Sequence, residues 1–478
     1  MKKTVSVLCL ILAVVMTYGY YQLAPVLQGG SGYAAKNICS GHFLSGFSGE
    51  QIVEQALLGA SPLLGRISYQ VNEQEHSVDT SLMGFFKRKA ILVDGIGCTL
   101  LAAGDEAVQH RVEVNPVQPL DVNTPWPQGR APANTATAYA QLLDEAFLEP
   151  SAESAQGQQP IADQTSASAE ERPVKQPRNT KAVVIVHHGQ LVAERYADGV
   201  NPDTPLIGWS MTKSVTSLLT GMLVKDGLLD IDQPAAVAQW QQDETDPRRA
   251  ITLDQLLRMS SSLEFDETYD VLSDVSEMLS NQPDAAAFAA SKPLIAEPGA
   301  VWSYSSGTTN IVSSIIRQTL GGELQAYYNF TRERLFNPLG IRSAVLETDA
   351  SGTFIGSSYG YSSSRDWARL GQFCLQNGRW QGQQLLPENW IAYSAAPTPS
   401  NPGNDYGAQF WLNVNPQDSN RQRPWPSLPE DAFFFSGYQG QFVAVIPSKD
   451  LVVVRLGFTP NGNHGTEQLI AGVIDLLP

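Results

Sequence analysis

The sequence predicts an α/β fold in which an antiparallel sheet with flanking helices is combined with an all-helical lobe. Residues 182–196 contain a β-branched run, a His-Gly turn and an alternating run, which is the pattern of a β-hairpin. Near the C-terminus, residues 441–446 and 451–456 have strand character, with a Pro-Ser-Lys-Asp turn between them. Segments of helical periodicity lie between the hairpin and these strands. This order favours one sheet that encloses a helical lobe.

The predicted helices are identified by apolar residues that recur at helical spacing. In residues 210–224 this spacing is clear, and Gly227 follows as a stop signal. The same spacing predicts further helices over residues 136–148, 251–259, 310–320, 324–335, 365–376 and 466–477.

The N-terminus has the pattern of an export signal. Lys2 and Lys3 form a basic start, and residues 4–16 are uncharged and apolar. The apolar character continues weakly to Leu23, and only a poor cleavage site follows the apolar run. Residues 1–30 are therefore predicted to be a signal peptide or an uncleaved membrane anchor through residues 4–23. Either alternative places the protein in the periplasm or on the outer face of the inner membrane.

The rest of the chain is long enough for more than one folded unit. Residues 31–150 are predicted to be an N-terminal extension that follows a Gly-rich joint at residues 28–32. Residues 151–180 are rich in Ser, Ala, Gln, Glu and Pro, which predicts a flexible linker or surface insertion. Residues 181–478 are predicted to form the main domain.

Charge and cysteine content restrict the partners and the compartment. The formal net charge of -17 argues against a nucleic-acid partner, because binding phosphates requires clustered Lys and Arg. Cys39 and Cys98 are candidates for a disulfide in an oxidising compartment, and the alternative is two buried free thiols. The six His residues show no metal-ligand spacing, and no cofactor is predicted.

The strongest chemical signal is a Ser and a Lys at the start of a predicted helix. Ser210 and Lys213 are three residues apart and therefore lie on one face, where the amine can reach the hydroxyl. Burial and the helix N-terminus both favour a neutral amine, which can act as a base. A Ser and a Lys at this spacing occur by chance at many helix starts, so the catalytic interpretation depends on other motifs in the chain.

Two downstream segments supply that context. Tyr304 lies on a loop between helical segments and could relay a proton to a leaving group; the alternative is a packed core tyrosine. Ser436 and Gly437 are small residues at a strand, where backbone N–H groups could form an oxyanion hole with the N–H of Ser210. The alternative for these two residues is a structural Gly-rich strand end.

These motifs, in this order, resemble those of the penicillin-recognising serine hydrolases. Within them the chain resembles the class C β-lactamase-related group, which includes esterases and 6-aminohexanoate-dimer hydrolases. The resemblance covers roughly residues 181–478 and includes GWSMTKSVTSLLTGMLVKDGLLDID, SYSSGTTN and GYQGQFVAVIPSKDLVVVRLG. It implies the β-lactamase-like fold and no metal or organic cofactor. It further implies a nucleophile at Ser210, a base at Lys213, a proton shuttle at Tyr304, oxyanion donors at the N–H groups of Ser210 and Tyr438, and substrate contacts at Ser306, Ser436 and Gly437.

One position departs from the family pattern. Phe435 stands where β-lactamases and D-Ala-D-Ala peptidases carry the Lys or His that helps to hold a substrate carboxylate. Losing that charge-assisted hydrogen bond removes about 1.5–3 kcal/mol. Uncharged esters or small amides, such as 6-aminohexanoate oligomers, are therefore the favoured small-molecule substrates. The alternatives are a β-lactamase or D,D-peptidase, a non-hydrolytic binding or sensor module, and a structural envelope protein.

Overall fold

The computed structural model describes residues 2–477, except for 103, 106, 109, 134, 150–177, 419 and 461–463, and it describes side chains from residue 23 onward. Most of the linker predicted at residues 151–180 therefore lies outside the described residues, as do the side chains of the apolar run up to residue 22. Within the described part of the chain, no helix has both the length and the apolar character that crossing a bilayer requires.

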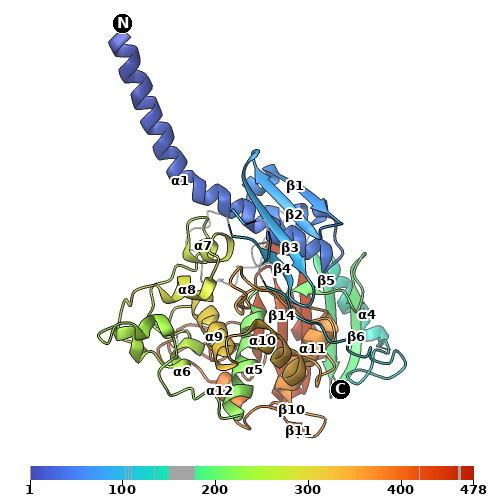
Figure 1. Ribbon diagram of the computed structural model, residues 1–478. Coiled ribbons are helices and arrows are strands. Elements are labelled where there is room, and N and C mark those ends of the chain that lie inside the picture. Colours follow the sequence, from blue (N-terminus) through green and yellow to red (C-terminus); the bar gives the residue numbers. More distant parts are fainter. Residues whose placement is uncertain are drawn as a thin grey trace.

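A six-stranded antiparallel sheet lies at the centre of the molecule (Figure 1). The predicted hairpin forms one edge of it, and the two predicted C-terminal strands lie beside that hairpin. The strands, in their order across the sheet, are β12 (Trp411–Leu412), β13 (Phe433–Gly437), β14 (Gln441–Ile446), β15 (Leu451–Gly457), β5 (Thr180–His187) and β6 (Gln190–Tyr196).

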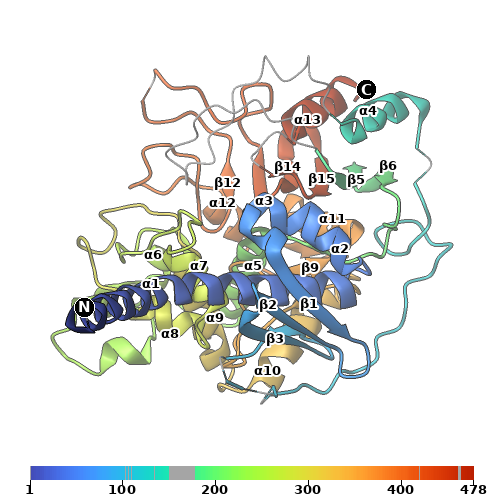
Figure 2. The ribbon, with the colours of Figure 1, turned by 90° about the horizontal axis from the view of Figure 1, so that it is seen from above.

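Helices cover both faces of this sheet (Figure 2). Val184 and Val186 of β5 belong to the main hydrophobic core, whereas Val183 and Ile185 belong to a second core on the opposite face. This alternation explains why β5 is a continuous apolar run, since both of its faces are covered. The helices on the first face are α5 (Met211–Lys225) and α11 (Ser364–Leu375), and those on the second face are α4 (Thr137–Phe147) and α13 (Thr466–Asp475).

A helical lobe is formed mainly by the segment between α5 and α11 in the sequence, as predicted, and α12, which follows α11, packs against α6. The helix predicted over residues 324–335 is α-helical to Phe330 and continues as a π-helical turn, Thr331–Phe336. A short sheet in the order β7-β9-β8 joins this lobe to the α5 region. The lobe and this sheet contain α6 (Leu253–Leu257), α7 (Asp274–Ser280), α8 (Ala285–Ala290), α9 (Ser306–Thr319), α10 (Leu324–Phe330), α12 (Trp390–Ser394), β7 (Leu206–Ile207), β8 (Val345–Leu346) and β9 (Gly360–Ser362).

The N-terminal region is a long helix that packs on a second sheet, and the sequence predicted neither. The helix α1 (Lys2–Phe43) contacts the antiparallel strands β1 to β4, most extensively β2 and β3. These strands are followed by a long irregular segment that leads to α4 (Figure 2). Their bounds are β1 (Ile67–Asn72), β2 (Ser77–Leu82), β3 (Phe85–Val93) and β4 (Gly97–Leu100).

The predicted Gly-rich joint at residues 28–32 is wrong, because these residues are helical. Their glycines serve close packing instead of a turn. A Cβ at Gly32 would lie 2.6 Å from the backbone oxygen of Ser280 at the end of α7, and one at Gly29 would contact Asn281. The helix tolerates the helix-weakening glycines because they allow α1 to lie against the helical lobe.

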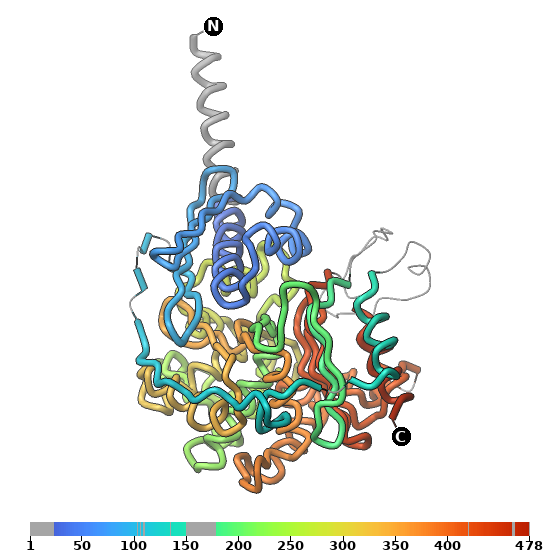
Figure 3. Tube along the Cα trace, turned by 90° about the vertical axis from the view of Figure 1, so that its right-hand side faces the viewer, coloured from blue at the N-terminus to red at the C-terminus, as the bar shows by residue number. Residues whose placement is uncertain are grey.

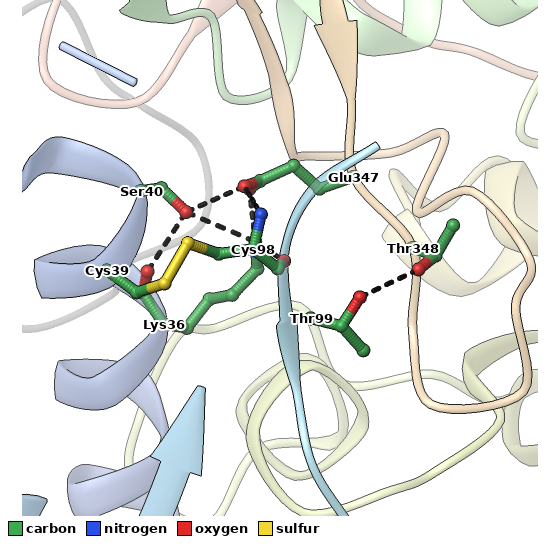
Figure 4. The surroundings of a disulfide bond; sticks show 7 residues. All are labelled: Lys36, Cys39, Ser40, Cys98, Thr99, Glu347 and Thr348. Atoms are coloured by element: carbon green, nitrogen blue, oxygen red, sulfur yellow. Dashed lines mark hydrogen bonds and ion pairs between the residues drawn. A yellow bond between two sulfur atoms is a disulfide. The ribbon is translucent and has the colours of Figure 1, made fainter. Parts of the chain in front are cut away.

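Covalent and ionic contacts fix α1 to the rest of the chain (Figure 4). The sulfur atoms of Cys39 on α1 and Cys98 on β4 form a disulfide, with a Cα–Cα distance of 6.1 Å. Beside it, Lys36 forms an ion pair with Glu347, which follows β8. Both charged side chains are buried. The N-terminal extension is therefore packed into the same structure as the main domain.

Candidate active site

Ser210 and Lys213 meet at the start of α5. Ser210 is the N-cap residue of this helix, and Trp209 before it has a φ of +47°, so the chain turns sharply into the helix. The Lys213 Nζ atom donates a hydrogen bond to the Ser210 Oγ atom at 3.1 Å. Ser210 is half-buried, whereas Lys213 is buried. The predicted juxtaposition of hydroxyl and amine is thus present, with the hydroxyl on the more accessible side.

The surroundings of Lys213 lower the pKa of its amine. Its Nζ atom also donates to the Ser306 Oγ atom at 2.9 Å and to the Ser357 backbone oxygen at 3.1 Å, and it lies 4.8 Å from the centre of the Tyr304 ring. Burial lowers the pKa of Lys213 to about 8, although the charge of Glu267 opposes this change. A substantial fraction of the amine is therefore neutral near pH 8, which a general base requires.

Glu267 is a buried carboxylate next to Ser306, and no sequence motif marks it as part of the site. One of its oxygens accepts the Ser306 backbone N–H at 2.7 Å, and the other accepts the Ser306 hydroxyl and, at 3.0 Å, the Tyr269 hydroxyl. Burial raises the pKa of Glu267, and Lys213 opposes that change. Glu267 stands in the acidic stretch 264–270, which is typical of an exposed loop, so only the folded chain distinguishes it.

Ser306 differs from its predicted role as a substrate contact. It is the first residue of α9, and its side chain is fully buried between Lys213 and Glu267. A hydroxyl that donates to the carboxylate and accepts from the amine is already occupied on both sides. The structure therefore places Ser306 as a link between the candidate base and the Glu267 carboxylate.

The contacts of Glu267 predict a shift in the pH dependence of activity. With Lys213 as the general base, the neutral amine is the active form, and kcat/KM is expected to rise with pH through a limb near pH 8. The carboxylate favours the ammonium form, and its removal in Glu267→Gln is expected to move this limb to lower pH. Glu264→Gln, in the same loop but exposed, is the control. Identical pH profiles for the two variants would contradict this electrostatic link.

Tyr304 belongs to an aromatic wall beside Lys213. It is half-buried in the loop before α9, and its ring centre lies 5.2 Å from that of Trp411 and 5.6 Å from that of Tyr406. Trp302 also contacts Tyr406, at 5.8 Å. Trp411 is half-buried in the edge strand β12, and this position brings its ring to the same wall.

The end of β13 approaches the turn before Ser210. A Cβ at Gly437 would lie 2.1 Å from the Gly208 backbone oxygen, so only glycine fits here. This approach brings Tyr438 to the turn that carries Ser210, and the Tyr438 ring lies 5.9 Å from that of Trp209. Ser436 and Gly437 are partly accessible. The two backbone segments predicted to form an oxyanion hole therefore lie side by side.

Phe435 occupies the position at which many members of the family carry a cation, and the nearby Arg455 does not supply the missing charge. Phe435 is buried, with its ring centre 5.1 Å from that of Phe410 in the main core. Arg455 is also buried and donates to the backbone oxygens of Gln439 and Gly440, at 3.3 and 2.7 Å. Its guanidinium stabilises the β13–β14 turn, so this nearby cation does not replace the missing charge. Within the described residues, no cluster of metal-ligating side chains was found.

Comparisons with known proteins show to which family the chain is similar. The family profile described as "Beta-lactamase" matches residues 165–471. A 6-aminohexanoate-dimer hydrolase from Paenarthrobacter ureafaciens is 22% identical over 298 residues, which are 59% of this chain and 73% of that protein. A Bacillus anthracis structure provisionally assigned as a 6-aminohexanoate-dimer hydrolase is 25% identical, with a TM-score of 0.52, and the match covers 63% of this chain and 81% of that one. A penicillin-binding protein homologue from Caulobacter crescentus is 17% identical, with a TM-score of 0.48, over 72% of this chain and 98% of that one.

Proposed function

The chain belongs to the β-lactamase family of serine hydrolases, and from this premise we propose that it hydrolyses uncharged esters or small amides through an acyl-enzyme on Ser210. One observation carries the proposal: the Ser210 hydroxyl is 3.1 Å from the amine of Lys213, whose burial lowers its pKa to about 8. A nucleophile within reach of a neutral base is what acyl transfer requires.

The proposed reaction has two halves. In the first, the Ser210 Oγ atom bonds to the substrate carbonyl carbon while its proton passes to the Lys213 amine. The backbone N–H groups of Ser210 and Tyr438 stabilise the oxyanion. The bond to the leaving group then breaks, and the leaving group takes the proton from Lys213 by way of the Tyr304 hydroxyl. In the second half, water gives its proton to the same base and adds to the acyl carbon, which releases the acid and restores the Ser210 hydroxyl.

The walls of the site support an uncharged substrate. Tyr304, whose ring centre is 4.8 Å from the Lys213 amine, and its neighbour Trp411 are half-buried. Tyr438 is also half-buried, and its ring lies 5.9 Å from that of Trp209, the residue before Ser210. Phe435 takes the position of the carboxylate-binding cation and is buried. Aromatic surfaces bind the apolar acyl or amine portion of a substrate by van der Waals contact. They offer no charged partner to a substrate carboxylate. The relatives named for 6-aminohexanoate-dimer hydrolysis agree with a small linear amide as one substrate class.

We further propose that the protein acts after export. The basic and apolar N-terminus supports this location. The Cys39–Cys98 disulfide supports it independently, because structural disulfides persist in oxidising compartments such as the periplasm.

The test is turnover by the purified full chain of a short-chain nitrophenyl ester, a chromogenic cephalosporin and the 6-aminohexanoate dimer. We expect ester or dimer hydrolysis, and a single adduct on Ser210 when a fluorophosphonate is added and the protein is digested for mass spectrometry. Hydrolysis of the cephalosporin alone would favour a β-lactamase. A stable adduct without turnover of any substrate would favour a sensor, and no adduct at all would refute the acyl-enzyme.

A further inference from the structure

The four-stranded sheet of the N-terminal region ends in exposed apolar side chains. Met83 and Phe85, at the turn between β2 and β3, are 71% and 69% exposed. Leu63, in the turn of helix just before β1, is 55% exposed. Ile67 at the start of β1 pairs with Leu82 at the end of β2, so all three side chains lie at the same end of the sheet.

This end of the sheet lies beside the part of α1 at which the described side chains begin. The Leu82 side chain lies 3.7 Å from the Cβ position of Gly30, and Thr80 donates a hydrogen bond to the Ser31 backbone oxygen at 2.8 Å. At the opposite end of the sheet, His76 contacts Phe43, the last residue of the helix. Strand β2 therefore runs toward the middle of α1, where Leu23 is 57% exposed. Figures 1 and 3 both show the sheet end beside the helix.

The charges at this end differ from those of the whole chain. Arg66 and Lys87 are exposed beside the apolar side chains. Residues 55–72 and 80–93 contain no Asp or Glu, although the chain has a formal net charge of -17. An apolar tip with basic neighbours is the composition that binds anionic lipid surfaces, since the apolar groups enter the acyl region and the cations meet the phosphates.

We propose that Leu23, Leu63, Met83 and Phe85, with Arg66 and Lys87 around them, form a lipid-contacting surface that seats this end of the molecule on an anionic bilayer. The chain next to this surface supports a bilayer over a protein partner. Residues 4–22, directly before Leu23, are uncharged and largely apolar. The surface thus adjoins a segment whose apolar composition also favours contact with lipid. Together, the surface and residues 4–22 determine which side of the molecule faces the membrane.

The test uses the full chain with one environment-sensitive fluorophore. It is attached at Phe85→Cys in a Cys9→Ser background, and a second preparation carries it at Met83→Cys. Cys374 does not compete for the label, because it is buried and its burial raises the pKa of the thiol. The matched control is Leu228→Cys, an exposed leucine after α5 that is 56% accessible. Turnover of the nitrophenyl ester verifies that each labelled protein is folded.

In phosphatidylcholine–phosphatidylglycerol vesicles that contain doxyl-labelled lipids, we expect severalfold stronger quenching at positions 83 and 85 than at position 228. Equal quenching at the three positions, or a protein that does not sediment with the vesicles, would overturn the proposal. A spectral change at position 85 that depends on protein concentration without lipid would also overturn it and indicate a second copy as the partner.

The charge contribution is tested with Arg66→Gln and Lys87→Gln in the full chain. Each cation near an anionic surface is expected to contribute about fivefold in vesicle affinity, measured by co-sedimentation over a range of lipid concentrations. The loss should vanish on vesicles of phosphatidylcholine alone. An equal loss on neutral vesicles would contradict the electrostatic part of the proposal.

Discussion

Replacing Ser210 by Ala is expected to lower kcat for the best ester or amide substrate by about a thousandfold to a millionfold. The reason is structural: the Ser210 Oγ atom is the hydroxyl held 3.1 Å from the buried amine of Lys213, and alanine removes the atom to which the acyl group would bond. The measurement is steady-state hydrolysis, with fluorophosphonate labelling as a second readout.

A matched control lies one turn along the same helix. Ser214 is buried, and its hydroxyl donates to the Gln409 backbone oxygen at 2.7 Å, away from Lys213. Ser214→Ala is expected to lose about 1 kcal/mol of stability and to keep kcat. Activity that survives Ser210→Ala, or that falls equally in both variants, would refute Ser210 as the nucleophile.

Lys213→Met is expected to lower kcat by a comparable factor, because methionine fills the space of the aliphatic chain and cannot accept a proton. Residues that act as one unit are not additive in their effects. The double variant with Ser210→Ala should therefore be no less active than Ser210→Ala alone. A further large loss in the double variant would mean that the two residues act in separate steps.

The sequence could predict those parts of the site that depend on local spacing. Ser210 and Lys213 share one helical face, so three residues of separation were enough to bring them together. Glu267 reaches Ser306 across 39 residues of chain, and no local pattern marks that contact. The buried role of Ser306 is hidden for the same reason, because it depends on how α9 packs against the loop at Glu267.

The fold shows the same division between local and distant information. The family resemblance and the β-lactamase-like α/β fold are confirmed. The hairpin β5–β6 and the amphipathic helices were predictable because their periodicity is local. Strand β1 is exposed or half-buried along its whole length, and one of the buried positions of β3 is the charged residue Arg88, so neither strand shows an alternation of apolar and polar residues in the sequence. The run of glycines in α1 resembled a joint because Gly29 and Gly32 pack against Asn281 and Ser280, which are about 250 residues away in the sequence.

The second large effect is expected at the buried ion pair that holds α1. The Lys36 Nζ atom contacts the Glu347 carboxylate, the Cys98 backbone oxygen at 2.6 Å and the Ser40 hydroxyl at 3.3 Å. The carboxylate in turn accepts the Cys98 N–H at 2.6 Å and the Ser40 hydroxyl at 2.8 Å (Figure 4). Burial lowers the pKa of Lys36 and raises that of Glu347, so each charge depends on the other.

Lys36→Met is expected to lower the free energy of unfolding by about 3–5 kcal/mol, because it leaves the Glu347 carboxylate buried without its cation. The control is Lys89→Met, which breaks the exposed ion pair with Glu75 in the same region, where the charged atoms are 3.0 Å apart. That loss should be at most about 1 kcal/mol. Urea denaturation with the disulfide intact measures the free energy of unfolding of both variants.

The double variant Lys36→Met with Glu347→Leu tests whether the loss of stability comes from the uncompensated charge. Removing both charges leaves no uncompensated charge, so this variant should recover most of the stability that Lys36→Met loses. Activity gives a further readout, since the Tyr33 ring on α1 lies 6.2 Å from that of Trp209, the residue before Ser210. If α1 supports the turn at Ser210, the single variant loses kcat and the double variant regains it. A cost for Lys36→Met no greater than that for Lys89→Met would mean that α1 is held by the disulfide and by packing alone.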